Sequence, residues 1–144
     1  MRIVRVAGAF AASVIIAYFF AAVFYTQRVL AKQAEIGALY TPAQQAETYI
    51  TNLIGLWLYG AMIAIALLIA FLVAAGVKRV LKPLALVAYP IAGAAAIYVL
   101  LTLVEAQLGG GAGIIGGART ALGVGLQCLA GFLGGTAFAV LTRR

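Results

Sequence analysis

The sequence predicts an all-α integral membrane protein with four transmembrane helices. Of its 144 residues, 66% are hydrophobic and only 9% are charged, whereas soluble domains carry about 25% charged residues. The hydrophobic residues fall in four long runs, and basic residues gather at the ends of these runs. A chain with so little polar surface cannot face water on all sides, so we expect a single domain within a lipid bilayer.

Each run is long enough to cross a bilayer, because a hydrocarbon core about 30 Å thick takes roughly 20 helical residues. The first run is too long for the apolar region of a cleaved signal peptide, and bulky Phe24 and Tyr25 end it where small residues favour cleavage. We therefore expect it to stay in the protein as a signal anchor. The four runs are 6–25, 53–77, 84–104 and 120–142.

Aromatic residues and one proline refine this picture. Tyr49, Trp57 and Tyr59 flank the outer end of the second run, where an interfacial belt of aromatic side chains is expected. Pro90 lies within the third run and is expected to kink that helix.

The basic residues predict the orientation. With the N-terminus inside, the cytoplasmic side carries seven basic and no acidic residues, and the other side carries three of each. This bias follows the positive-inside rule, so both termini are expected in the cytoplasm of a plasma membrane such as the bacterial inner membrane. Lys78, Arg79 and Lys82 lie between the second and third runs, where they either mark topology alone or bind anionic lipid headgroups or a partner. The cytoplasmic set is Arg2, Arg5, Lys78, Arg79, Lys82, Arg143 and Arg144.

A helical hairpin is expected in the connection 26–52. Its first half is rich in Ala, Gln, Lys and Glu, which favour helix, so the first helix is expected to extend to about Tyr40. Thr41, Pro42 and Gln44 then fit a helix start with a threonine N-cap, proline at the first position and a capping box. This helix is expected to run straight into the second span. The hairpin either projects beyond the membrane or lies on its surface.

The chain lacks the residue types that most enzymes and metal sites need. It has no histidine, no aspartate and one cysteine, Cys128, which is expected to act as a small apolar side chain. These residues cannot build a Ser-His-Asp triad, a Cys/His zinc site or a haem ligand. We therefore expect a non-catalytic protein without cofactor or metal. The basic residues form no phosphate-binding stripe, so nucleic acid is not an expected partner.

The fourth run carries small residues at a spacing of four, which lets two helices approach closely. The pattern predicts a packing surface and leaves open whether it meets a helix of this chain, meets a partner chain or lines a pore. One ridge consists of Arg119, Gly123, Gln127, Gly131, Gly135 and Ala139, and a neighbouring row consists of Gly117, Ala121 and Gly125.

Gln127 falls near the middle of the fourth span, where an amide must find a hydrogen-bond partner. We expect it to bond Thr102, Tyr98 or Ser13 in an interhelical contact, with contact to a transported solute as the alternative.

Glu105 and Arg119 flank the glycine-rich connection 109–117, and they are expected to form an ion pair at the outer interface. In a second interpretation, Glu105 shares one helix face with Tyr98 and Thr102 and contacts an ion. The connection itself is either flexible or re-entrant, and re-entrant backbone requires shielding from lipid by protein.

Two functions from different classes fit the sequence. The first is an accessory or structural subunit that packs against partner subunits in a larger membrane complex. The second is a small homo-oligomeric channel or transporter for an ion or small solute, built on Gln127, Glu105 and Arg119. If small-residue faces stay uncovered after the four helices pack, the first function is favoured.

Overall fold

The computed structural model describes residues 2–107 and 120–143, apart from the side chain of Ala85. Four of the described helices are long and apolar enough to cross a membrane: α1, α3, α4 and α5. The predicted polytopic all-α fold is therefore confirmed. The elements are α1 (Arg2–Glu35), α2 (Pro42–Gly55), α3 (Trp57–Val80), the short 3-10 helix η1 (Lys82–Leu86), α4 (Ala88–Gln107) and α5 (Ala121–Thr142).

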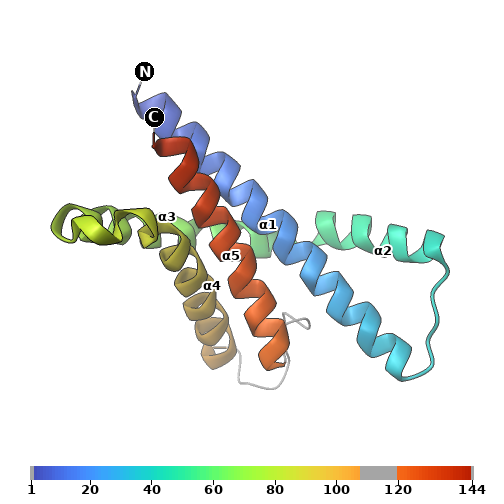
Figure 1. Cartoon of the computed structure of the whole chain (residues 1–144). Helices are drawn as coiled ribbons and strands as arrows, with labels where there is room; N and C mark the ends of the chain where they lie inside the picture. The colour runs from blue at the N-terminus through green and yellow to red at the C-terminus, as the bar shows by residue number, and fades with distance from the viewer. Residues whose placement is uncertain (1, 108–119, 144) are drawn as a thin grey trace.

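Helix α5 lies between α1 and α4 and runs antiparallel to both, so the two chain termini meet at one end of the molecule (Figure 1). Helix α3 crosses α1 and α5 steeply in this view and packs mainly against α4.

An aromatic cluster joins three of the spans. The rings of Phe71 in α3 and Phe138 in α5 stack with centroids 4.6 Å apart, and Tyr89 of α4 lies edge-on to Phe138 at 4.8 Å.

The start of α2 confirms the capping prediction. The hydroxyl oxygen of Thr41 accepts a hydrogen bond from the backbone N–H of Gln44, and the Gln44 side-chain oxygen accepts one from the N–H of Thr41. These reciprocal bonds satisfy backbone donors that have no partner within the helix.

The predicted end of the first helix near Tyr40 is wrong, because α1 ends at Glu35. Gly37 adopts a left-handed conformation with φ of 85°. The N–H groups of Gly37 and Ala38 donate to the carbonyls of Ala34 and Gln33, respectively. This pattern is a Schellman motif, in which a left-handed glycine stops the helix although the following residues favour helix.

Helix α2 does not run unbroken into the second span. Leu56 separates α2 from α3, with φ of −84° and ψ of 16°. The hairpin is also open, because within the described part of the chain no residue of α2 is buried. Two bonds hold its base: the Asn52 amide donates to the Thr26 hydroxyl at 3.1 Å, and the Tyr18 hydroxyl donates to the Leu53 carbonyl.

The third span begins later than predicted, because η1 occupies residues 82–86 and α4 starts only at Ala88. Pro90 consequently lies in the first turn of α4 and not inside the span. Backbone N–H groups in the first turn have no partner within the helix, so a proline there removes no hydrogen bond and the predicted kink is not required.

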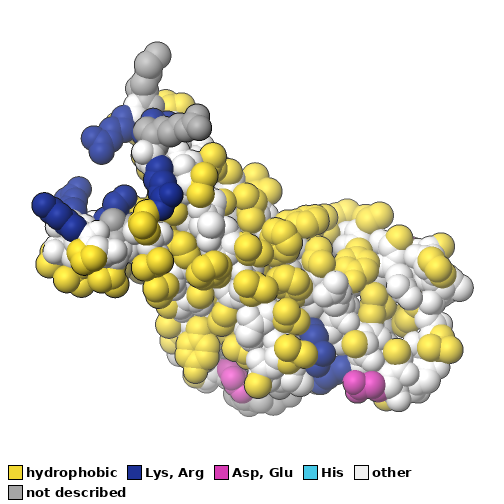
Figure 2. Space-filling view, viewed as in Figure 1, with side chains coloured by type: hydrophobic (Ala, Val, Ile, Leu, Met, Phe, Trp, Pro, Cys, Tyr) yellow, Lys and Arg dark blue, Asp and Glu magenta, His cyan; other side chains and the backbone are white. Residues whose placement is uncertain are grey.

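Charge is divided between the two ends of the molecule. Figure 2 shows the basic side chains gathered mainly at the end where both termini lie and the acidic side chains towards the other end. The basic end carries the exposed residues Arg2, Arg5, Lys78, Arg79, Lys82 and Arg143. This separation along the helix axes agrees with a membrane-spanning arrangement, and the cytoplasmic placement of the basic end stays a prediction.

Candidate functional site

The C-terminal half of the α5 ridge lies against the backbone of α4. A Cβ atom on Gly131 would meet the carbonyl oxygen of Gly93 and would lie 2.5 Å from Cγ1 of Ile97. A Cβ atom on Gly135 would meet the Tyr89 carbonyl oxygen and would lie 2.9 Å from Cα of Pro90. Only hydrogen fits at these two positions, so the α4 and α5 backbones are in direct contact.

The N-terminal half of the same ridge faces different neighbours. Each step of four residues advances by about 400° around a helix, so the row turns by about 40° at every step. Gln127 therefore faces the junction of α1 and α3, whereas Gly131 and Gly135 face α4. Gly123, which begins the described part of the row, is also buried. The ridge serves two interfaces within this chain.

Gln127 is only 1% exposed, and both ends of its amide are bonded. Its oxygen accepts from the Tyr59 hydroxyl of α3 at 2.9 Å, and its nitrogen donates to the Ala21 carbonyl of α1 at 3.0 Å. The predicted partners are wrong: Thr102 donates to the Val99 carbonyl of its own helix, and Ser13 bonds elsewhere. Tyr98 and Thr102 lie on α4, which Gln127 does not face, and Ser13 bonds Gly134, seven residues further along α5.

Tyr59 departs from the interfacial belt that its position suggested. The side chain is 4% exposed, whereas Trp57, two residues earlier, is 69% exposed. Two residues that are two positions apart lie on nearly opposite sides of a helix. Trp57 therefore faces outward, whereas Tyr59 faces Gln127. An aromatic residue near a span end can thus be a buried hydrogen-bond donor.

Helix α1 supplies a seam of small residues that sequence reasoning missed. Its members recur every four positions, and all are buried against the bundle: Ala9, Ser13, Ala17 and Ala21. The Ser13 hydroxyl donates to the Gly134 carbonyl at 2.7 Å, and a Cβ on Gly134 would lie 2.8 Å from Cβ of Ala17. The spacing was visible in the sequence, but alanine is so frequent in this helix that the row did not stand out.

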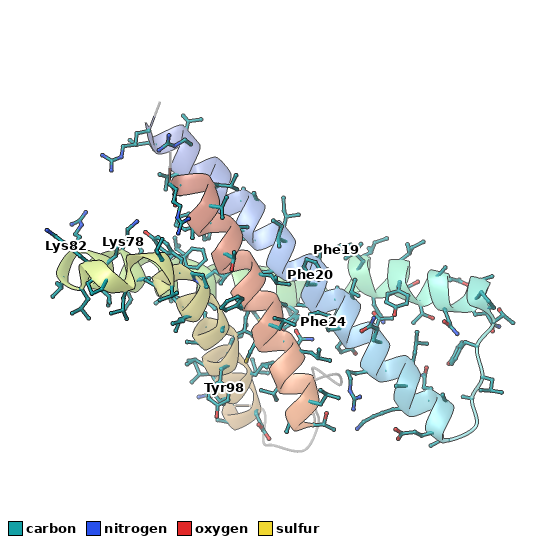
Figure 3. All side chains as sticks on the ribbon, in the orientation of Figure 1. Phe19, Phe20, Phe24, Lys78, Lys82 and Tyr98 are labelled. Carbon is teal, nitrogen blue, oxygen red and sulfur yellow. The ribbon has the colours of Figure 1, made fainter. Side chains whose placement is uncertain are left out.

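The structure describes only part of the predicted polar sites between α4 and α5. Arg119 and the connection 109–117 lie outside the described part of the chain, so the predicted ion pair with Glu105 lies outside it too. Glu105, Tyr98 and Thr102 are exposed on α4, and Figure 3 shows Tyr98 projecting from the helix. The described residues contain no group of three His, Cys, Asp or Glu side chains able to hold a metal ion.

Lys78, Arg79 and Lys82 are exposed at the end of α3 and the start of η1 (Figure 3). The Lys78 ammonium lies 5.4 Å from the ring centroid of Tyr89, within the range of a cation–π contact. Lys78 is thus tied to α4, and Arg79 and Lys82 extend from the same basic turn.

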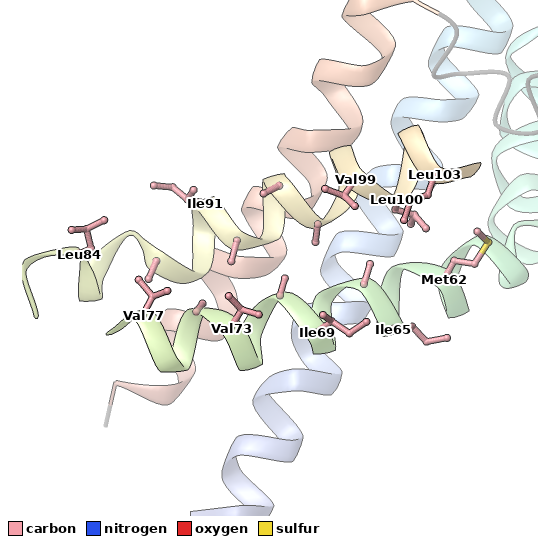
Figure 4. A pocket seen from close by; sticks show the side chains of 17 residues that line it. Met62, Ile65, Ile69, Val73, Val77, Leu84, Ile91, Val99, Leu100 and Leu103 are labelled. Atoms are coloured by element: carbon pink, nitrogen blue, oxygen red, sulfur yellow. The ribbon is translucent and has the colours of Figure 1, made fainter. Parts of the chain in front are cut away.

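A groove of about 590 Å³ lies between α3 and α4 beside this turn, where the two helices leave part of their surfaces uncovered. All 17 residues that line it are apolar, and seven of them are alanines whose small side chains leave the space open. Figure 4 shows Val77 and Leu84 at one end of the groove and Met62 and Leu103 at the other.

Comparison with models of known protein families, with curated proteins and with solved structures finds no match to this chain. The function is therefore inferred from the geometry of the four spans, from the helix faces that they leave uncovered and from the groove.

Proposed function

We propose that the chain is a non-catalytic subunit of a larger membrane complex and packs against a partner subunit through the outward face of α5. The observation that carries this proposal is Gly125. Gly125 is exposed within α5, and beyond its own helix no described atom lies within 4 Å of where a Cβ would stand. Ala121, one turn earlier on the same side, is also exposed.

Helix α5 contains glycines that contact α4 and a glycine, Gly125, that contacts no other described helix. Glycine lowers helix stability by roughly 1 kcal/mol relative to alanine. At Gly131 and Gly135, close contact with α4 compensates this loss. At Gly125 the described chain offers no such contact, and lipid does not require a small residue. A transmembrane helix of another subunit at Ala121 and Gly125 would supply the missing backbone contact.

The outer hairpin offers a second surface for a partner. Ile50, Ile54 and Trp57 recur at helical spacing and are 61%, 70% and 69% exposed. Asn52, which bonds α1, lies on the opposite side of α2. The hairpin therefore turns its apolar stripe away from the other helices of the chain.

Several observations favour a subunit over a channel or transporter. The fully buried polar side chains of the described helices, Gln127, Ser13 and Thr26, are engaged in hydrogen bonds within the protein, as is Tyr59. Half-buried Arg28 bonds Thr120, and its buried Nε finds no partner among the described residues. The groove between α3 and α4 is lined by apolar residues, which cannot replace the hydration shell of an ion. The residue inventory, with no histidine or aspartate, supports the non-catalytic part of the proposal.

The test is purification of the tagged chain in mild detergent, with identification of any chain that co-purifies in fixed ratio. Gly125→Leu should remove the partner while leaving the isolated chain folded, because no described atom beyond the helix lies within 4 Å of a Cβ at this position. Ala11→Leu, which adds bulk at an exposed position of α1, should retain the partner. Recovery of the wild-type chain alone, as a monomer or a homo-oligomer, would refute the proposal, and a homo-oligomer would support the channel instead.

A further inference from the structure

The groove between α3 and α4 must be filled when the protein is in a bilayer. An apolar space of about 590 Å³ lies in the range of roughly 300–1,000 Å³ typical of ligand sites. Water is unfavourable there, because a buried water needs two to four polar partners and every lining residue is apolar. The natural occupant of such a space inside a membrane is hydrocarbon.

The charge at one end of the groove identifies the kind of hydrocarbon. Val77 and Leu84 line the groove at the end where the basic turn lies, and the exposed residues Arg79 and Lys82 belong to that turn. The acidic residues of the chain are Glu35, Glu47 and Glu105, none of which belongs to this turn. Basic side chains at the membrane surface attract anionic headgroups.

We infer that the groove holds an acyl chain of an anionic phospholipid whose phosphate contacts Arg79 and Lys82. Lys78 is turned towards Tyr89 and contributes charge to the same turn. A second copy of this chain in the same orientation would bring a second basic turn to the same end, and the like charges would repel each other. Charge complementarity therefore favours the lipid over a second copy.

This site goes beyond the proposed subunit function and does not depend on it. The groove lies between α3 and α4, whereas Gly125 and Ala121 lie on α5. Loss of lipid binding and loss of a partner subunit would be separate results from separate variants.

The experiment titrates dioleoyl phosphatidylglycerol or dioleoyl phosphatidylcholine into the detergent-purified protein and counts bound lipids by native mass spectrometry. The wild type should bind phosphatidylglycerol more tightly than phosphatidylcholine. Arg79→Gln combined with Lys82→Gln should weaken phosphatidylglycerol binding about 25-fold, from about fivefold for each basic group near an anionic lipid. Arg2→Gln combined with Arg5→Gln removes equal charge from the same end and should leave binding unchanged.

A second pair of variants tests the groove itself. Ala95 lines the groove and is exposed, so Ala95→Phe should fill the groove and weaken binding of both lipids at least fivefold. Ala61→Phe adds the same bulk at an exposed position of α3 outside the groove and should have no effect. Equal affinity for the two lipids, wild-type binding by either test variant, or a protein dimer that Ala95→Phe dissociates would overturn the inference.

Discussion

Replacing Gly131 with alanine adds one methyl group where the backbones of α4 and α5 meet. The new Cβ would lie 2.5 Å from Cγ1 of Ile97, whereas ordinary van der Waals contact begins at 3.4 Å, so these atoms must separate by about 0.9 Å. The Gly93 backbone, with its carbonyl carbon 2.9 Å away, blocks the same space and cannot rotate aside as a side chain does. The variant therefore forces α4 and α5 apart.

The magnitude follows from two opposing terms. Overpacking of this kind destabilises by about 1–3 kcal/mol, and the better helix propensity of alanine returns about 1 kcal/mol. A net loss of up to about 2 kcal/mol is expected for Gly131→Ala. At Gly125 a Cβ would meet no described atom beyond its own helix, so Gly125→Ala keeps the propensity gain and should stabilise the isolated chain by up to about 1 kcal/mol.

Reversible unfolding of the purified protein, in mixed micelles with increasing SDS, measures both variants against the wild type. The two substitutions are chemically identical and lie in the same helix. The contribution of helix propensity therefore cancels in the difference between their free energies of unfolding. A difference of about 1–3 kcal/mol is expected, because only the packing term at Gly131 remains. Equal stability of Gly131→Ala and Gly125→Ala would refute the close α4–α5 contact.

Three further predictions concern other parts of the molecule. Tyr59→Phe removes the hydroxyl that donates to Gln127 and should lower stability in the same unfolding assay by about 0.6–2 kcal/mol; wild-type stability would contradict the bond. Thr41→Ala should weaken the start of α2 by about 1 kcal/mol, seen as faster hydrogen exchange there while exchange in the α1–α5 core is unchanged. On a cysteine-free background, a cysteine at Lys78 should react with an impermeant thiol reagent only from the cytoplasmic side, and one at Glu47 only from outside; the reverse pattern would invert the topology.

The sequence predicts the spans well, because their length is set by membrane thickness and their composition by lipid. It also predicts the Thr41 cap, which depends on residues within one turn. Both features are local, and they need no knowledge of what lies across the bundle. The end of α1 was missed for a related reason: Gly37 is a local stop signal, but it competes with residues that favour helix on both sides.

The contacts between helices were harder to predict. A spacing of four defines a row but not its direction, because the row turns around the helix. Gln127 and Gly131 therefore look equivalent in sequence, although one meets Tyr59 and the other meets Gly93. Tyr59 itself carries no sequence signal that separates a buried donor from an interfacial aromatic. Only the packing of three helices together assigns these roles.

The bonds between α1 and α5 have a consequence for biosynthesis. Ser13 bonds Gly134, which follows 121 positions later, and Ala21 bonds Gln127, which follows 106 positions later. At about 5–20 residues per second, a ribosome delivers the last helix roughly 6–24 s after Ser13. During this interval the small-residue seam of α1 lacks its contacts with α5. A chain truncated before α5 never forms these contacts. The hydrogen bonds between α1 and α5 can therefore form only after the last helix has been synthesised.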